Sequence, residues 1–215
     1  MARFGPIRRS LLNWFRRNQR DYPWRKTGNW FHLLMAEMML RRTRADQVVP
    51  VYDEFTRRCE TPTDAARLSR PALGKILAPL GLRWRAEQLH DTIHYLRDHY
   101  ALRAPEPSDD LRDIPGVGEY SEAMLRNRLF GERVAAVDIN LVRVISRWEA
   151  LPFDAETRRR KPFTTLANRF MNSKHARDLN VALLDLSALL CRPVKPACGD
   201  CPVRRYCRTG TPAGD

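Results

Sequence analysis

Four cysteines close together near the end of the chain constrain its fold more than any other sequence feature. They are Cys191, Cys198, Cys201 and Cys207, spaced C-x6-C-x2-C-x5-C. Four thiolates this close in sequence can reach one common metal centre, and they suit zinc and a [4Fe–4S] cluster alike. Disulfides are the weaker interpretation, because the first residues show no apolar core of a secretion signal. The spacing predicts a metal-bound C-terminal segment, with Cys59 left over as a buried apolar residue.

The charge balance points to a polyanionic partner. Lys and Arg number 38 against 25 Asp and Glu, which gives a formal net charge of +13. Only five of the cations are lysine, and arginine suits bidentate contacts to phosphate and stacking on bases. Nucleic acid is therefore the favoured partner, and a basic protein without such a partner is the alternative.

Apolar residues recur at helical spacing along nearly the whole chain. Residues 30–40 are apolar almost all round, which is typical of a helix buried on every side, and residues 181–190 predict another strongly apolar helix. Residues 134–137 could form a short strand, but no partner strand is evident. No apolar run is long enough to span a bilayer. We expect an all-α protein of the cytoplasm that does not enter membranes, with residues 209–215 as a frayed tail.

A Pro- and Gly-containing turn occupies residues 111–121, Leu-Arg-Asp-Ile-Pro-Gly-Val-Gly-Glu-Tyr-Ser. Gly116 and Gly118 allow a close approach of the backbone to a ligand and permit a positive φ. The first N–H groups of the helix that follows suit a phosphate. An ordinary helix–helix turn is the alternative, and the pattern gains weight only beside the basic charge and the cysteines.

Two carboxylates stand out, each with a plain structural alternative. Glu37 lies inside the apolar helix and is followed by Arg41 and Arg42. Burial favours the protonated carboxyl group, which suits a general acid, but a structural Glu–Arg pair is slightly favoured on sequence alone. Asp138 opens a helix, where an aspartate is most often an N-cap.

Two further groups of residues are better explained without function. His90 and His94 stand at i, i+4, but no third metal ligand is nearby, so solvated helix histidines are favoured. The basic run from Arg158 to Lys161 is most simply a solvated surface, or a contact to the DNA backbone.

Together these motifs resemble the helix-hairpin-helix DNA glycosylases that carry an iron–sulfur cluster. That family includes endonuclease III, the MutY-type adenine glycosylases and the Mig-type thymine mismatch glycosylases. The resemblance runs from about Leu11 to Cys207 and keeps the hairpin, Val137-Asp138 and the cysteines in the family's order. It implies a [4Fe–4S] cluster on the four cysteines and two all-helical domains. These would be a six-helix domain with the hairpin at 26–133, and a cluster domain built from 1–25 and 134–215.

The residue after Glu119 separates the members of this family. Endonuclease III has a lysine there that attacks the sugar, whereas this chain has Tyr120, and no lysine occurs between Lys75 and Lys161. A Schiff-base mechanism needs an amine nucleophile, so the resemblance implies a monofunctional enzyme. Tyrosine at this position, and Arg41-Arg42, are typical of the Mig type. One departure is the segment after the hairpin helix, where Arg126 and Arg128 replace residues that are small or apolar in most of the family.

The resemblance implies removal of thymine or uracil mispaired with guanine in double-stranded DNA, by a monomer. Asp138 would stabilise the oxocarbenium-like sugar, Glu37 would assist the leaving base or orient the water, and Tyr120 would line the pocket. The remaining residues implied in DNA binding are Arg41, Arg42, Leu82, Gly116, Val117 and Gly118, with the backbone of Tyr120. The alternatives are excision of adenine or another damaged base, and a non-catalytic iron–sulfur DNA-binding protein. In a bacterium or archaeon the protein would lie on the nucleoid.

Overall fold

The computed structural model describes residues 4–81 and 83–210, and every regular element in them is helical. The all-α class is therefore confirmed. The chain divides into two units by its internal contacts. Asp21–Leu125 form one, here called the central unit, and the residues up to Arg20 together with Arg126–Asp215 form the other, the terminal unit. The chain passes from one unit to the other at 20/21 and at 125/126, whereas the boundaries expected from the sequence are 25/26 and 133/134.

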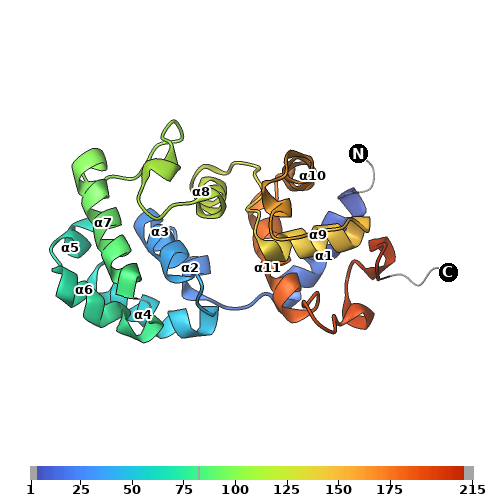
Figure 1. Cartoon of the computed structure of the whole chain (residues 1–215), viewed down its shortest axis with the longest axis horizontal. Coiled ribbons are helices and arrows are strands. Elements are labelled where there is room, and N and C mark those ends of the chain that lie inside the picture. The colour runs from blue at the N-terminus through green and yellow to red at the C-terminus, as the bar shows by residue number, and fades with distance from the viewer. Residues whose placement is uncertain (1–3, 82, 211–215) are drawn as a thin grey trace. The chain divides into compact units, whose positions relative to one another are not determined.

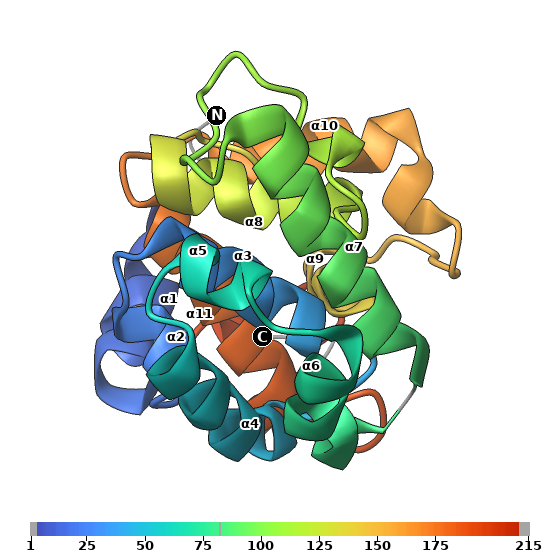
Figure 2. The ribbon, with the colours of Figure 1, turned by 90° about the vertical axis from the view of Figure 1, so that its left-hand side faces the viewer.

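The central unit is built around α3, a helix with buried residues on every side. Seven of its ten residues are buried, among them Phe31, Met35 and Met39. It packs against α2, α4, α7 and α8, and α7 packs in turn against α5 and α6 (Figure 2). The elements are α2 (Pro23–Lys26), α3 (Trp30–Met39), α4 (Ala45–Arg58), α5 (Pro62–Ala66), α6 (Arg70–Leu77), η1 (Ala78–Leu80), α7 (Arg83–Tyr100), η2 (Leu111–Asp113) and α8 (Glu119–Leu125).

Capping residues set where these helices begin. The side chain of Asn29 accepts hydrogen bonds from the first-turn amides of α3, at 2.9 Å from Phe31. Thr61 and Asp64 form a reciprocal capping box at α5. These side chains satisfy amides that have no acceptor within the helix.

The terminal unit is assembled around α11, which packs against α1, α9 and α10 (Figure 1). Its elements are α1 (Phe4–Asn18), the π-helical turn η3 (Arg126–Phe130), α9 (Ile139–Glu149), η4 (Thr157–Arg159), α10 (Lys161–Met171), α11 (Ala176–Leu189), η5 (Cys198–Asp200) and η6 (Arg204–Tyr206). The fully buried carboxylate of Asp185 accepts from Nε of Arg20 at 2.6 Å and from its backbone amide at 3.0 Å. These contacts hold Arg20 against α11, and the chain enters the central unit at the next residue.

The departure at Arg126 and Arg128 coincides with the π-helical turn. Arg126 pairs with Glu132 at 3.0 Å, and the buried Asn127 donates to the carbonyl of Glu132 at 2.8 Å. The wider π turn changes which side chains of this segment face the core. None of the helices in the described ranges is long and apolar enough to cross a membrane.

Candidate functional site

The hairpin before α8 requires glycine at one of its two glycine positions. Gly116 has φ +89°, and a Cβ built on it would lie 2.6 Å from Cε of Met38 and 3.0 Å from Cδ of Gln88. The hairpin backbone therefore lies directly against the side chains of α3 and α7, which would have to shift if residue 116 had a Cβ, and the positive φ itself favours glycine. Gly118 has open space around its missing Cβ, so packing within the described structure does not require a glycine there.

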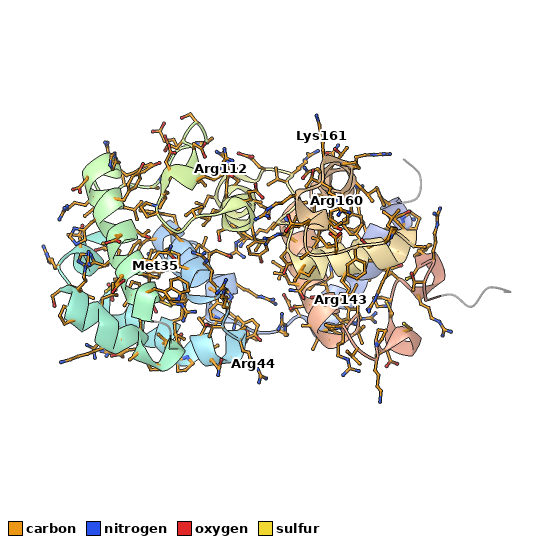
Figure 3. The ribbon with its side chains drawn as sticks, viewed as in Figure 1. Met35, Arg44, Arg112, Arg143, Arg160 and Lys161 are labelled. Carbon is orange, nitrogen blue, oxygen red and sulfur yellow. The ribbon has the colours of Figure 1, made fainter. Side chains whose placement is uncertain are left out.

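The carbonyl groups of the hairpin are held by side chains of its own unit. Thr92 donates to the carbonyl of Pro115 at 2.6 Å, and Arg41 donates to the carbonyl of Gly116 at 3.2 Å. The first amides of any α-helix have no acceptor within that helix, so a helix start such as that of α8 suits an anion. Arg112, labelled in Figure 3, lies 3.1 Å from Asp110 and 3.3 Å from Glu122.

Two of the side chains implied in DNA binding, Arg41 and Arg42, lie in the described turn after α3. Arg41 is exposed, donates to Gln88 at 2.7 Å and lies over the ring of Trp84 at 5.7 Å, so it is bonded to its own unit. Arg42 is also exposed, and its backbone has φ +55°, a conformation that residues other than glycine rarely adopt. Leu82 lies outside the described residues.

Glu37 and Tyr120 lie on neighbouring helices of the central unit. Glu37 is on α3 and Tyr120 is in the first turn of α8, and these two helices pack against each other. Both side chains are half-buried. Glu37 is thus less buried than its flanking residues Ala36 and Met38, whose exposures are 1% each.

Asp138 caps α9, as its position at a helix start predicts. Its Oδ1 accepts from the amide of Leu141 at 2.8 Å, and its Oδ2 accepts from Nδ2 of Asn140 at 2.6 Å. Side-chain Oδ1 of Asn140 accepts in turn from Nη1 of Arg143 at 3.1 Å, and Nε of Arg143 donates to the backbone carbonyl of Cys191 at 2.9 Å. A continuous series of hydrogen bonds therefore joins the Asp138 carboxylate to the backbone of the first cysteine.

Arg143 is the buried cation of this series. It is 6% exposed and is labelled on α9 in Figure 3. Burial lowers its pKa, and the nearby charges of Cys191 and Asp138 oppose that effect. A guanidinium group stays protonated in this setting, so Arg143 is a fixed positive charge close to Asp138.

The segment before Asp138 is extended but forms no strand in the described structure, so the short strand considered for 134–137 is absent. Two asparagine side chains take the place of a partner strand. The buried Asn180 donates to the carbonyl of Val134 at 2.9 Å and accepts from the amide of Ala136 at 3.0 Å. Asn168 accepts from the amide of Ala135 at 2.9 Å. These bonds fix the backbone that leads into the α9 cap.

The four cysteines surround one small cavity. All four are free thiols and line a volume of about 200 Å³ with Arg147 and Trp148. Burial raises the pKa of the Cys201 thiol to about 11 and also raises that of Cys207. No three His, Cys, Asp or Glu side chains in the described ranges converge closely enough to hold a single metal ion. The four thiols nevertheless line one cavity, and this donor set suits zinc and an iron–sulfur cluster alike.

Arg147 connects the cysteine segments to α9. Its guanidinium lies 3.4 Å from Sγ of Cys191, and its carbonyl oxygen accepts from the hydroxyl of Thr209 at 2.7 Å and from Sγ of Cys207 at 3.5 Å. The expectation of a frayed tail from residue 209 is therefore wrong at its first residue, because Thr209 closes the turn that holds Cys207.

Charge is unevenly divided between the two units. The residues of the terminal unit include 23 Lys and Arg against 9 Asp and Glu, whereas the central unit has 15 against 16. The basic run from Arg158 to Lys161 extends from the end of η4 to the first residue of α10 in the terminal unit, where Figure 3 labels Arg160 and Lys161. The polyanion-binding charge inferred from the whole sequence thus belongs to one unit.

Sequence reasoning assigned no role to three well-placed polar residues. Arg85 is buried in the central unit, and Asn180 and Arg143 are buried in the terminal unit. Their neighbours at helical spacing include polar as well as apolar residues, so the sequence shows neither their burial nor their partners.

A helical fold with a glycine hairpin and a four-cysteine centre defines a class of DNA-repair proteins, and solved structures agree. A thermostable thymine-DNA glycosylase superimposes with a TM-score of 0.88 at 31% identity over 97% of both chains. Endonuclease III in a non-covalent DNA complex superimposes with a TM-score of 0.76 at 22% identity, over 98% of this chain and 97% of that chain, which shows the shared fold.

Sequence comparison identifies the family. Residues 35–167 match the HhH-GPD superfamily of base excision DNA repair proteins, and this chain belongs to that superfamily. It is 33% identical to the thymine/uracil-DNA glycosylase of Methanothermobacter thermautotrophicus over 92% of this chain and 90% of that protein. It is 30% identical to the thymine-DNA glycosylase of Aeropyrum pernix over 96% and 95%. The resemblance drawn from the motifs is confirmed.

Proposed function

We propose that this protein hydrolyses the N-glycosidic bond of thymine or uracil mispaired with guanine in double-stranded DNA. The observation that carries the proposal is its similarity, along almost the whole chain, to proteins named thymine/uracil- and thymine-DNA glycosylase. The human adenine DNA glycosylase is 28% identical over 97% of this chain, but the match spans only 40% of that protein. Adenine excision is therefore the second candidate.

Asp138 is the proposed catalytic carboxylate. As the bond to the base breaks, positive charge develops on the sugar, and a fixed carboxylate stabilises that charge in the transition state. The bonds from Leu141 and Asn140 hold both oxygens in place, so little reorganisation is needed. Glu37 is proposed to protonate the departing base or to orient the attacking water.

The reaction is proposed to stop at the abasic site. Tyr120 lines the pocket at the position where an amine would start strand cleavage, and a phenol cannot form a Schiff base with the sugar. Water is then the nucleophile, and the products are a free base and an intact DNA strand with an abasic sugar.

A [4Fe–4S] cluster is the proposed resident cofactor. Cys191, Cys198, Cys201 and Cys207 would hold it, because four free thiols line one cavity of about 200 Å³. When bound, the cluster supplies four iron–thiolate bonds that cross-link the C-terminal segment. Arg147 donates to one of the sulfurs and braces the segment against α9.

Double-stranded DNA is the proposed partner, bound by a monomer. The amides of Gly116, Val117, Gly118 and Tyr120 would receive a backbone phosphate, while Arg41, Arg42 and Leu82 act at the vacated stack. The target nucleotide is flipped out, which costs a few kcal/mol and less at a mismatch. The central unit would then act as the hairpin domain and the terminal unit as the cluster domain. The protein is proposed to work in the cytoplasm or on the nucleoid.

A panel of duplexes tests the function. Single-turnover excision is measured on otherwise identical duplexes that carry G·T, G·U, A·G, A·8-oxoguanine or hypoxanthine. We expect release of thymine and uracil, and no strand break without alkali. Adenine release with no action on G·T or G·U would move the protein to the second candidate function.

A further inference from the structure

Arg85 is the largest fully buried side chain in the described part of the chain, with 1% of its surface exposed. It stands in the first turn of α7, where a positive charge opposes the helix dipole. Within the described residues its Nε has no hydrogen-bond partner, and its other nitrogens face carbonyl and hydroxyl oxygens rather than a carboxylate. Burial and the charge of Arg41 lower its pKa. Burying a charge costs desolvation energy, which its hydrogen bonds to these oxygens and its position 5.7 Å from the Trp84 ring centroid offset in part.

The guanidinium of Arg85 joins two turns that are distant in sequence. Its Nη2 donates to the carbonyl of Arg41 at 2.6 Å and to the hydroxyl of Thr43 at 2.7 Å. Its Nη1 donates to the carbonyl of Leu80 at 3.0 Å. One planar group thus fixes the turn 41–43 and the turn that begins at Leu80.

The turn 41–43 carries an unusual backbone at its middle residue, Arg42. Arg42 lies between the two residues bound by Nη2, has φ +55° and exposes its side chain. Gly81 follows the carbonyl bound by Nη1 and has φ +66°. A left-handed conformation at an arginine persists only where its surroundings impose it, and such positions cluster at functional sites.

We propose that Arg85 is a positioning residue that holds the turn 41–43 and the backbone at Leu80 and Gly81 at a fixed separation, so that they meet the DNA as one rigid element. This inference rests on the proposed function, because filling the vacated stack is useful only if a base is flipped. The fork of an arginine can reach both turns at once, whereas the compact ammonium group of a lysine presents its donors from one point. Arg85 acts through the two turns and not on the reacting atoms.

The test compares excision from paired and unpaired DNA. Arg85→Met removes every donor at similar length, and Arg85→Lys keeps the charge. Thr43→Val removes one acceptor with little risk to folding. Arg97→Met is the matched control, because Arg97 lies on the same helix but is exposed and pairs only with its neighbour Asp98 among the described contacts. Uracil is placed opposite guanine in a duplex, and in the same strand within a run of mismatches where it is already unstacked.

We expect Arg85→Met to slow excision from the G·U duplex by about 10²-fold, the usual consequence of a displacement near 1 Å, and to leave the mismatched-run rate unchanged. Arg85→Lys and Thr43→Val should show smaller losses in the same direction, and Arg97→Met none. An equal loss on both substrates, or no loss on the duplex, overturns the inference.

A binding measurement separates this inference from the proposed function. A fluorescent 2-aminopurine next to the G·U pair reports unstacking when the protein binds, whether or not excision follows. Wild-type protein should raise the fluorescence and Arg85→Met should not, while thermal unfolding monitored by circular dichroism shows whether the variant is folded. If wild-type protein unstacks the probe but excises neither uracil nor thymine, the proposed function fails. An equal rise in wild type and Arg85→Met refutes the role of Arg85.

Discussion

Replacing Asp138 by asparagine separates the capping role of this residue from its proposed catalytic role. Asparagine caps a helix about as well as aspartate does, and its amide oxygen can still accept from Leu141 where Asp138 Oδ1 accepts now, at 2.8 Å. What Asp138→Asn removes is the negative charge and one of the two acceptor oxygens, the one that Asn140 now approaches at 2.6 Å.

The structure sets different magnitudes for stability and for rate. Loss of one net hydrogen bond costs about 0.5–1.5 kcal/mol, so the free energy of unfolding should fall by no more than about 1.5 kcal/mol. Loss of a preorganised charge in the transition state costs about 2.7–4 kcal/mol, or roughly 10²–10³ in rate. Asp138→Ala should lose rate similarly, and it should also lose the cap, which contributes about 0.5–2 kcal/mol.

The assay is single-turnover release of uracil from a G·U duplex, beside binding of the same duplex and urea unfolding. We expect Asp138→Asn to bind almost as wild type and to unfold almost as wild type, but to excise about 10²-fold or more slowly. An excision rate within a factor of about two of the wild-type rate would leave Asp138 as a helix cap only. That result would refute this reasoning.

Three further substitutions test other parts of the structure. Gly116→Ala should lower the melting temperature by several degrees, because the left-handed φ costs about 1–2 kcal/mol and the new Cβ meets Met38 and Gln88; an unchanged melting curve would contradict the close packing of the hairpin. Arg147→Met should speed bleaching of visible cluster absorption by a chelator, since it removes the donor to Cys191 and the contacts to the following loop; equal bleaching rates would exclude this bracing role. Tyr120→Lys should introduce strand cleavage and a borohydride-trapped adduct, because an amine replaces the phenol; trapping by the unmodified enzyme would instead refute a monofunctional reaction.

The residues that could be predicted from sequence are those whose requirement is local. The buried helix α3, the positive φ of Gly116 and the cap at Asp138 follow from periodicity, from the absence of a side chain and from position at a helix start. The four free cysteines around one cavity follow from short spacing. In each case the neighbours in the chain carry the signal.

The hydrogen bonds between buried polar side chains and segments distant in sequence could not be predicted. Asn180 bonds to a segment 44 residues earlier, and Arg85 bonds to a turn 42 to 44 residues earlier. Such partners are decided by how helices pack, which a single sequence does not display. Residues 134–137 are an instance, because their sequence suggested a short strand, whereas the side chains of Asn168 and Asn180 supply hydrogen bonds that a partner strand would have supplied.

The uneven division of charge has a thermodynamic consequence for a protein that binds DNA. Every phosphate neutralised by a cation releases condensed counterions, and this release makes affinity fall steeply as salt rises. The terminal unit has a surplus of 14 positive charges and the central unit a deficit of one. Most of the counterion release should therefore arise from contacts of the terminal unit. Turns and hairpin amides of the central unit would contribute contacts that ionic strength changes little, so that salt controls how long the protein stays on DNA more than which nucleotide it selects.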